Sequence, residues 1–244
     1  MELKGKIVLV TGANGGIGMA LVKGLLDRGS AKVYAAARGT AGMAELTRLA
    51  DDRVVALRLD ITDAASVAAA AEQCRDIDLL VNNAGANRCV PLLAPSGMDG
   101  AREEMEVNFF GTLAVCRAFA PILTARGGTI VTVCSIIGLV NLPLNGTYCA
   151  SKAAVHSLLQ GVRAELAPKG VRVVGVYPGP VDTRMTAGQE IPKATPDQIA
   201  AEVLAGVESA LDEIFPDPMS RDVHAGLLTD PKRVEREFAA MIPA

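Results

Sequence analysis

The chain has 244 residues, of which 50% are hydrophobic and 21% are charged, and this supply of apolar residues excludes an intrinsically disordered protein. A length near 250 residues is typical of one α/β domain, so we expect a single domain over residues 1–244. The 24 Lys and Arg residues against 27 Asp and Glu residues give a net charge of −3, and aromatic residues make up 3% of the chain, which argues against a nucleic-acid partner.

Segments rich in Val and Ile alternate along the chain with segments that repeat apolar residues every three or four positions. The expected strands are residues 6–10, 32–37, 53–59, 77–82, 128–134 and 171–177, and the expected helices are residues 17–28, 40–50, 63–75, 98–124 and 151–167. This alternation predicts an α/β fold with one doubly wound parallel β-sheet, strand order 3-2-1-4-5-6, and helices on both faces.

The ends of these elements carry their own signals. Thr62 and Asp63 form an expected helix N-cap, and Gly29 and Gly170 stand where helix C-caps are expected. After Tyr177 we expect a loop to residue 196, a helix of about fifteen residues and a Pro-rich tail.

The cysteines and the N-terminal segment indicate the cellular compartment in which we expect the protein. Five cysteines without a Cys-x-x-Cys pair indicate a reducing environment. The first strand pattern begins without the apolar stretch of a signal peptide, and the longest apolar run, residues 129–140, is shorter than the roughly 18 residues that cross a bilayer. We therefore expect a cytoplasmic protein without a membrane partner. His156 and His224 have no Cys or carboxylate at metal-ligand spacing, so no metal site is expected.

A glycine-rich segment, residues 11–18, lies where the first strand passes into the first helix. Glycines let the backbone approach a pyrophosphate closely, and the N-terminus of the following helix offers N–H groups and a partial positive charge. The candidate cofactor contacts here are Gly12, Asn14, Gly15, Gly16, Ile17 and Gly18. Their spacing, G-x-x-x-G-x-G, differs from the general G-x-G-x-x-G fingerprint, and an ordinary glycine-rich turn is the alternative.

The end of the second expected strand indicates which dinucleotide would bind. A dinucleotide-binding fold places an acidic residue here for the ribose 2′-hydroxyl, or an Arg for a 2′-phosphate. No Asp or Glu occurs in residues 28–44, and Arg38 with Thr40 could hold the phosphate. NADP(H) is therefore favoured over NAD(H), with a solvated Arg at a strand end as the alternative.

Tyr148 and Lys152 stand four residues apart at the start of an expected helix, so they share one face. A neighbouring ammonium favours the phenolate, which would lower the Tyr148 pKa toward the range of an acid–base catalyst. Ser135 ends a buried-looking strand, where its hydroxyl could reach the same substrate oxygen. A Tyr-x-x-x-Lys pair alone is usually a surface pair, and Ser135 is what favours a catalytic interpretation.

Taken together, these motifs resemble those of the short-chain dehydrogenase/reductase family, in its branch of about 250 residues. The motifs, in the family's order and spacing from about residue 5 to 185, are Thr11-Gly-x-x-x-Gly-x-Gly18, Asn82-Asn83-Ala84-Gly85, Asn108, Ser135, Tyr148-x-x-x-Lys152 and Pro178-Gly179. The resemblance implies a Rossmann-type domain with a nicotinamide cofactor.

The resemblance also implies roles for individual residues. The catalytic ones are Tyr148 as acid/base, Lys152 to lower the Tyr148 pKa and hold the nicotinamide ribose, Ser135 to polarise the substrate oxygen, and Asn108 to anchor a water of the proton relay. Further cofactor contacts are Asp60 and Ile61 at the adenine, Asn83, Ala84 and Gly85 after the fourth strand, and Pro178, Val181 and Thr183 around the nicotinamide carboxamide. Structural roles stay open for two of them, since Asn83 could cap a strand end and Asn108 could bend a helix.

The implied function is an NADP(H)-dependent oxidoreductase that interconverts a ketone or aldehyde and an alcohol, with a small-molecule substrate. Residues 136–144 and 181–191 should wall the pocket, and their apolar content favours an apolar substrate; residues from about 178 to 244 form the substrate side and the tail. A non-catalytic NADP-binding regulator on the same fold is the alternative. The resemblance also implies a homo-oligomer. The family's Val-Asp-Gly-Gly-like turn, often an oligomer contact, is replaced here by Ile214-Phe215-Pro216-Asp217-Pro218, so a dimer is the alternative to a tetramer.

Overall fold

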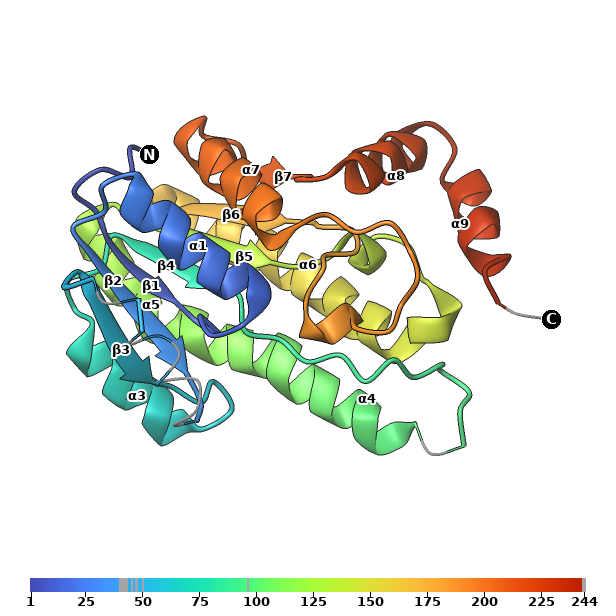
Figure 1. Ribbon diagram of the computed structural model, residues 1–244, viewed down its shortest axis with the longest axis horizontal. Helices are drawn as coiled ribbons and strands as arrows, with labels where there is room; N and C mark the ends of the chain where they lie inside the picture. Colours follow the sequence, from blue (N-terminus) through green and yellow to red (C-terminus); the bar gives the residue numbers. More distant parts are fainter. Residues whose placement is uncertain (40–43, 45, 47, 50, 96, 243–244) are drawn as a thin grey trace.

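The computed structural model describes residues 1–39, 44, 46, 48–49, 51–95 and 97–242, and a parallel sheet of seven strands lies at its centre (Figure 1). The order β3-β2-β1-β4-β5-β6-β7 confirms the order expected for the first six strands. The strands are β1 Ile7–Val10, β2 Lys32–Ala37, β3 Val54–Arg58, β4 Leu79–Asn82, β5 Thr129–Val133, β6 Arg172–Val176 and β7 Glu213–Ile214. Because neighbouring strands are parallel, they all end at the same edge of the sheet.

Helices cover both faces of the sheet. They are α1 Gly16–Asp27, α3 Ala64–Gln73, α4 Met98–Glu104, the π-helical η1 Met105–Gly111, α5 Thr112–Arg126, α6 Gly146–Leu166, α7 Pro196–Glu208, α8 Pro218–Thr229 and α9 Pro231–Ala239, with 3₁₀ turns η2 Ile136–Gly138, η3 Pro143–Asn145, η4 Ala167–Lys169 and η5 Arg184–Thr186. In β1, Val8 and Val10 belong to the core that α1 and α7 close, whereas Leu9 belongs to the core closed by α3, α5 and α6. Burial on both faces explains why the strands read as continuous apolar runs.

The expected helix ends agree with the structure where it describes them. The Asp63 carboxylate accepts a hydrogen bond from the Ala65 backbone N–H at 3.0 Å and caps α3. Gly29 follows α1 with φ +77°, and Gly170 follows η4 with φ +74°, a left-handed conformation that glycine adopts without strain. The helix expected over residues 40–50 lies mostly outside the described residues, as does Thr40.

One long helix, built from α4, η1 and α5, spans Met98–Arg126, close to the expected 98–124. Val115 and Phe119 of α5 are fully buried in the core on one side of the sheet. Among the described residues this is the one helix that is long and apolar enough to cross a membrane by length and composition alone, and 44% of its most apolar window is buried within the protein. A helix that covers a sheet in a core has the same length and composition.

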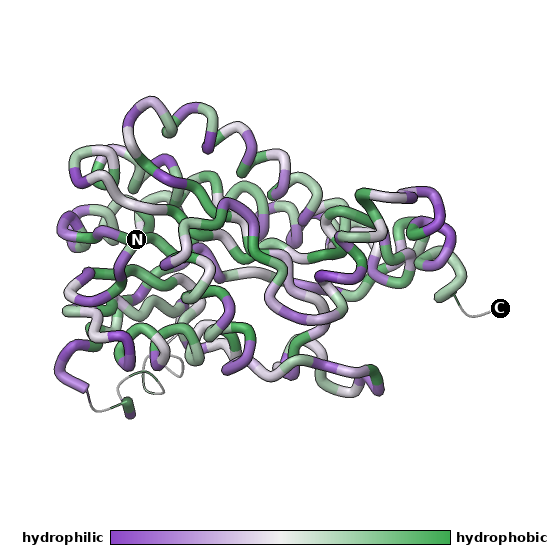
Figure 2. The backbone as a smooth tube through the Cα atoms, turned by 90° about the horizontal axis from the view of Figure 1, so that it is seen from above, coloured by the Kyte–Doolittle hydropathy of each residue, from purple (hydrophilic) through white to green (hydrophobic). Residues whose placement is uncertain are grey.

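The expectation of a Pro-rich tail is wrong, because residues 213–242 contain β7 and two helices. The helices α8 and α9 begin at Pro218 and Pro231, and the preceding Asp217 and Asp230 cap them with their carboxylates. Proline suits the first position of a helix because it lacks an N–H that would find no partner there, so these Asp-Pro pairs are helix starts. Figure 1 shows α8 and α9 at the end of the molecule toward which the strands run, and in Figure 2 the C-terminus lies at that same end.

Candidate active site

The carboxyl ends of the strands border a pocket of about 620 Å³. With the exception of Asn108, every expected site residue lines it: Gly12, Asn14, Gly15, Gly16, Ile17, Gly18, Arg38, Asp60, Ile61, Asn83, Ala84, Gly85, Ser135, Tyr148, Lys152, Pro178, Val181 and Thr183. Residues far apart in the sequence meet here because parallel strands bring their following loops to one edge of the sheet.

The glycine-rich turn fits a closely approaching ligand because side chains have no room there. Gly12 has φ +61°, and a Cβ atom added to it would lie 2.9 Å from Cα of Ala84. A Cβ added at Gly18 would lie 2.3 Å from the carbonyl oxygen of Gly12. The next helix, α1, begins at Gly16 without a side-chain cap and without an acidic residue in its first turn. Its N–H groups and positive dipole end therefore suit a phosphate.

Asn83 holds this turn in place. Its amide Nδ2 donates to the carbonyl oxygens of Thr11 and Gly12, each at 3.0 Å. In return, Thr11 Oγ1 accepts from the backbone N–H groups of Asn83 and Ala84 at 3.0 and 3.1 Å. Asn83 thus lines the pocket, but its side chain ties the end of β4 to the glycine-rich turn, which is a positioning role.

Charged groups surround the pocket end next to β2 and β3. Arg38 follows β2 and is exposed, while Asp60 follows β3 and is half-buried. The pKa of Asp60 is lowered, first by hydrogen bonds from the Thr62 side chain and backbone and further by Arg38 and Arg58. Both Thr62 bonds go to Oδ1 of Asp60, and the exposed Arg38 guanidinium on the pocket wall can meet a phosphate there.

Ser135, Tyr148 and Lys152 come together where β5 and α6 meet. The helix α6 begins at Gly146, earlier than expected, which puts Tyr148 in its first turn. Lys152 Nζ lies 5.6 Å from the centre of the Tyr148 ring and donates to the Val133 carbonyl at 3.0 Å. The Ser135 hydroxyl donates to the Pro178 carbonyl at 3.4 Å.

Gly138 explains how the turn after Ser135 packs so closely on α6. A Cβ atom added at Gly138 would lie 3.0 Å from the carbonyl carbon and oxygen of Lys152. Any larger residue would push the turn away from the helix. The glycine therefore fixes the spacing between the Ser135 hydroxyl and the side chains of Tyr148 and Lys152.

Burial dominates the ionisation of this group. It raises the pKa of Tyr148 above its ordinary value, and Cys134 and Glu104 act in the same direction, whereas a hydrogen bond with Ser135 lowers it. Burial also lowers the pKa of Lys152. The expectation that Lys152 brings the Tyr148 pKa below its ordinary value is thus wrong in this structure. The physical reason is that the ammonium faces the ring and bonds a backbone carbonyl, while both side chains lie out of water.

Asn108 lies behind the pocket wall rather than on it. Its Oδ1 accepts from the Ala86 N–H at 2.8 Å, and its Nδ2 donates to the Ala86 carbonyl and to Ser151 Oγ, both at 2.9 Å. Ser151 Oγ in turn donates to the Tyr148 carbonyl at 2.8 Å. In this structure the Asn108 amide is therefore engaged with the protein and supports the strand-end loop and the first turn of α6. It sits in the π-helical segment, consistent with the local change in helix geometry considered from the sequence.

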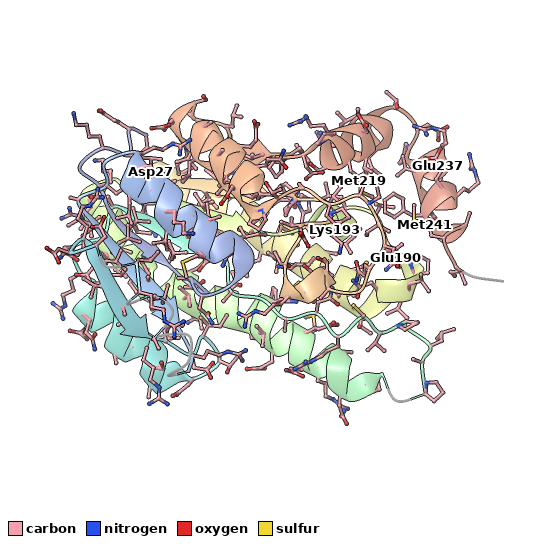
Figure 3. All side chains as sticks on the ribbon, viewed as in Figure 1. Asp27, Glu190, Lys193, Met219, Glu237 and Met241 are labelled. Atoms are coloured by element: carbon pink, nitrogen blue, oxygen red, sulfur yellow. The ribbon has the colours of Figure 1, made fainter. Side chains whose placement is uncertain are left out.

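Several residues on the pocket wall escaped the sequence reasoning. They are Asn87, Cys89, Asn145, Met219, Phe238 and Met241, whereas Met185 and Gln189 lie within the stretch 181–191 that was expected to wall the pocket. Asn145 could have been found, because it lies only three positions before Tyr148, at the start of the same helix. Met219 and Met241 could not, since they reach the pocket only through the packing of α8 and α9, where Figure 3 labels them.

The packing of α9 brings the end of the chain to the pocket. Val234 and Phe238 of α9 are buried against Val140, which follows the Ser135 turn. Phe238 also lines the pocket. The C-terminal helices therefore complete an apolar wall that begins at the substrate-side loop.

Among the described residues, no group of three or more His, Cys, Asp and Glu side chains could hold a metal ion. His156 instead forms a hydrogen bond with the Tyr177 hydroxyl at 2.8 Å, and the His224 ring stacks on Phe215 at 3.8 Å.

Comparison with known proteins identifies the family. The model of the short chain dehydrogenases matches residues 6–193. A crystal structure of a short chain dehydrogenase from Burkholderia cenocepacia J2315, in complex with NADP, is 41% identical with a TM-score of 0.93, and the match covers 100% of both chains.

Curated relatives match over a shorter region. The short-chain dehydrogenase PC-15 of Penicillium crustosum is 40% identical over 185 residues, 73% of this chain and 66% of that protein. The NADPH-dependent 1-acyldihydroxyacetone phosphate reductase of Saccharomyces cerevisiae is 35% identical over 198 residues, 78% of this chain and 66% of that protein. The glycine-rich turn, the seven-stranded sheet and these matches together show that the chain belongs to the short-chain dehydrogenase family.

Proposed function

We propose that this protein is an NADP(H)-dependent oxidoreductase that interconverts a ketone or aldehyde with the corresponding secondary or primary alcohol. The observation that carries the proposal is that one pocket joins the glycine-rich turn, which has no room for side chains, to Ser135, Tyr148 and Lys152. When bound, NADP(H) supplies or accepts the hydride, and the residues of the chain bind, orient and exchange the proton.

The choice of NADP(H) over NAD(H) rests on the charge at the end of β2. Arg38 lines the pocket there, and no acidic residue accompanies it in residues 28–39. A carboxylate at this place would bind a ribose 2′-hydroxyl and repel a 2′-phosphate, whereas a guanidinium binds the phosphate. The NADP complex of the Burkholderia protein and the NADPH dependence of the yeast reductase support the same choice.

Tyr148 is the proposed proton donor in reduction and the proton acceptor in oxidation. Burial raises its pKa, so the phenol is protonated at neutral pH, the form that reduction of a carbonyl requires. Ser135, whose hydroxyl also interacts with Tyr148, can exchange its long bond to the Pro178 carbonyl at 3.4 Å for one to the substrate oxygen. The Lys152 ammonium next to the ring stabilises the phenolate as the proton leaves.

The proposed substrate is bulky and apolar. Leu142 and Leu144 from the loop before α6, Met219 from α8, and Phe238 and Met241 at the end of the chain line the substrate side. Each buried methylene of a ligand gains up to about 0.8 kcal/mol in such surroundings. Hydrophobic ketones should therefore be preferred to sugars and to charged acids.

The proposal extends to the location and assembly of the protein. A cytoplasmic protein agrees with the free thiols of all five cysteines. A homo-oligomer, a tetramer or a dimer, would cover the exposed apolar side chains Leu93, Met98 and Phe110. The molar mass in solution, measured by light scattering after gel filtration, would distinguish these assemblies from a monomer.

A spectrophotometric panel tests the activity. Apolar ketones with NADPH, and secondary alcohols with NADP⁺, are followed at the nicotinamide absorbance band, with NADH and NAD⁺ as comparison. The proposal expects turnover of aryl alkyl ketones with NADPH. Tight NADPH binding without turnover of any carbonyl compound would favour the alternative, a cofactor-binding regulator.

A further inference from the structure

Asn145 stands at the N-cap position of α6, but its side chain does not cap the helix. It directly precedes α6, and an asparagine at a helix start ordinarily accepts a hydrogen bond from a backbone N–H of the first turn. Here no such side-chain bond exists, although the residue is only 7% exposed. Its backbone N–H donates to the Leu142 carbonyl at 2.8 Å, which leaves the amide group itself unexplained.

The Asn145 amide oxygen is buried without a hydrogen-bond partner. Within the described part of the chain, two other buried side-chain atoms share this condition, Glu104 Oε2 and Arg172 Nε, but neither of those residues lines the pocket. Asn145 does line it, and so does Tyr148, which follows three positions later in the first turn of α6. An unpaired buried acceptor is unfavourable in the protein alone and becomes favourable when a ligand brings a donor.

We infer that Asn145 is a specificity-determining residue whose amide oxygen accepts a hydrogen bond from a hydroxyl group of the substrate. The inference deepens the proposed function and rests on it. Asn145 is the N-cap of α6 and Tyr148 is its third residue, and an N-cap side chain ordinarily reaches the backbone of that third residue, so the hydroxyl must stand close to the carbonyl that faces Tyr148. The preferred substrate class is therefore an apolar ketone with a hydroxyl on the α or β carbon, together with the diol formed from it.

Asn87 provides a matched control within the same pocket. It also lines the pocket with an amide, but its Oδ1 already accepts a hydrogen bond from the Cys89 backbone N–H at 2.8 Å. A substitution there changes the pocket wall without removing a free acceptor. Loss of hydroxyl recognition should therefore follow Asn145→Leu and not Asn87→Leu.

The test compares pairs of ketones in which a methyl group replaces the hydroxyl. Phenacyl alcohol is paired with propiophenone, and β-hydroxypropiophenone with butyrophenone, each with NADPH. The unmodified enzyme should prefer at least one hydroxyketone to its partner by about tenfold or more in kcat/KM, the effect of a buried acceptor that loses its donor. Asn145→Leu should bring the ratio of kcat/KM within each pair of ketones close to one. α-Methoxyacetophenone, which cannot donate, should behave like propiophenone.

Two results would overturn the inference. One is an unmodified enzyme without preference for either hydroxyketone, or a preference that survives Asn145→Leu. The other is an equal loss for hydroxyketone and methyl partner, with a lowered melting temperature, which would assign Asn145 to the stability of α6. An equal preference for α-methoxyacetophenone would also contradict the hydroxyl donor, because it would mean that the amide donates.

The proposed function is tested by a different readout of the same experiment, the turnover of the ketones that lack a hydroxyl. Turnover of propiophenone or butyrophenone by the unmodified enzyme supports that function whatever Asn145 does. If no ketone were turned over, the proposed function would fail, and calorimetric titration of phenacyl alcohol and propiophenone into the NADP⁺-loaded protein would still decide the role of Asn145. The same tenfold difference in affinity, lost in Asn145→Leu, is the expected result.

Discussion

Replacing Arg38 with Asp should reverse the preference between the two dinucleotides. Arg38 lines the pocket at the end of β2 and lies close enough to Asp60 and Glu103 to lower the pKa of both carboxyls. A charge-assisted contact with a phosphate is worth about tenfold to a hundredfold in affinity, and exposure to solvent places Arg38 at the lower end. NADPH should thus be favoured over NADH by about tenfold in the unmodified protein. The new carboxylate would repel the 2′-phosphate and accept a bond from a ribose 2′-hydroxyl.

The assay measures kcat/KM and dissociation constants for NADPH and NADH in the unmodified protein, Arg38→Asp and Arg58→Asp. Arg58 is the matched control, because it is also exposed and also lowers the Asp60 pKa, but it does not line the pocket. Arg58→Asp should leave the preference for NADPH in place. The preference should also weaken as salt is added, since the contact is exposed. Equal kinetics with both dinucleotides in the unmodified protein would refute the reasoning.

Three further predictions concern the glycine-rich turn, the C-terminal wall and pH. Gly18→Ala should lower turnover roughly a hundredfold and weaken NADPH binding in a fluorescence titration, because its Cβ would lie 2.3 Å from the Gly12 carbonyl oxygen. Phe238→Ala removes a buried ring whose packing is worth about 3 kcal/mol, so it should raise the KM of butyrophenone and lower the melting temperature. Leu228→Ala is the control and should change neither, because Leu228 is 74% exposed. Ketone reduction should stay level from mildly acidic to mildly alkaline pH while alcohol oxidation rises, since burial raises the Tyr148 pKa and only oxidation needs the phenolate; a pH–rate profile of reduction that falls through neutrality would contradict this.

The sheet could be predicted from the sequence because the inner strands β1, β4 and β5 are buried on both faces. Runs such as those of β1 and β6 are continuous in Val, Ile and Leu, and the glycine-rich turn and the Asp63 cap are local signals. The C-terminal helices were missed for the opposite reason. The proline content after Phe215 favoured a tail, whereas Pro218 and Pro231 each occupy the first position of a helix after a capping Asp.

The sequence predicted which residues line the pocket better than it predicted their pKa shifts and hydrogen-bond partners. Ser135, Tyr148 and Lys152 do line one pocket, because the turn that follows Ser135 packs on the helix that carries the other two. The direction of the Tyr148 pKa shift depends on burial and on where Lys152 Nζ points, and neither is written in the spacing of the two residues. The same holds for Asn108, whose amide partners come from distant segments.

The central claim, that Tyr148 exchanges the proton with a carbonyl substrate, is tested most directly by Tyr148→Phe. The substitution keeps the ring and its packing and removes the hydroxyl alone. Single-turnover reduction of propiophenone with NADPH, measured together with the NADPH dissociation constant, should show a rate lower by about 10²–10⁴ and nearly unchanged cofactor binding. A Tyr148→Phe protein that reduces the ketone at close to the original rate, with NADPH bound as before, would contradict the account.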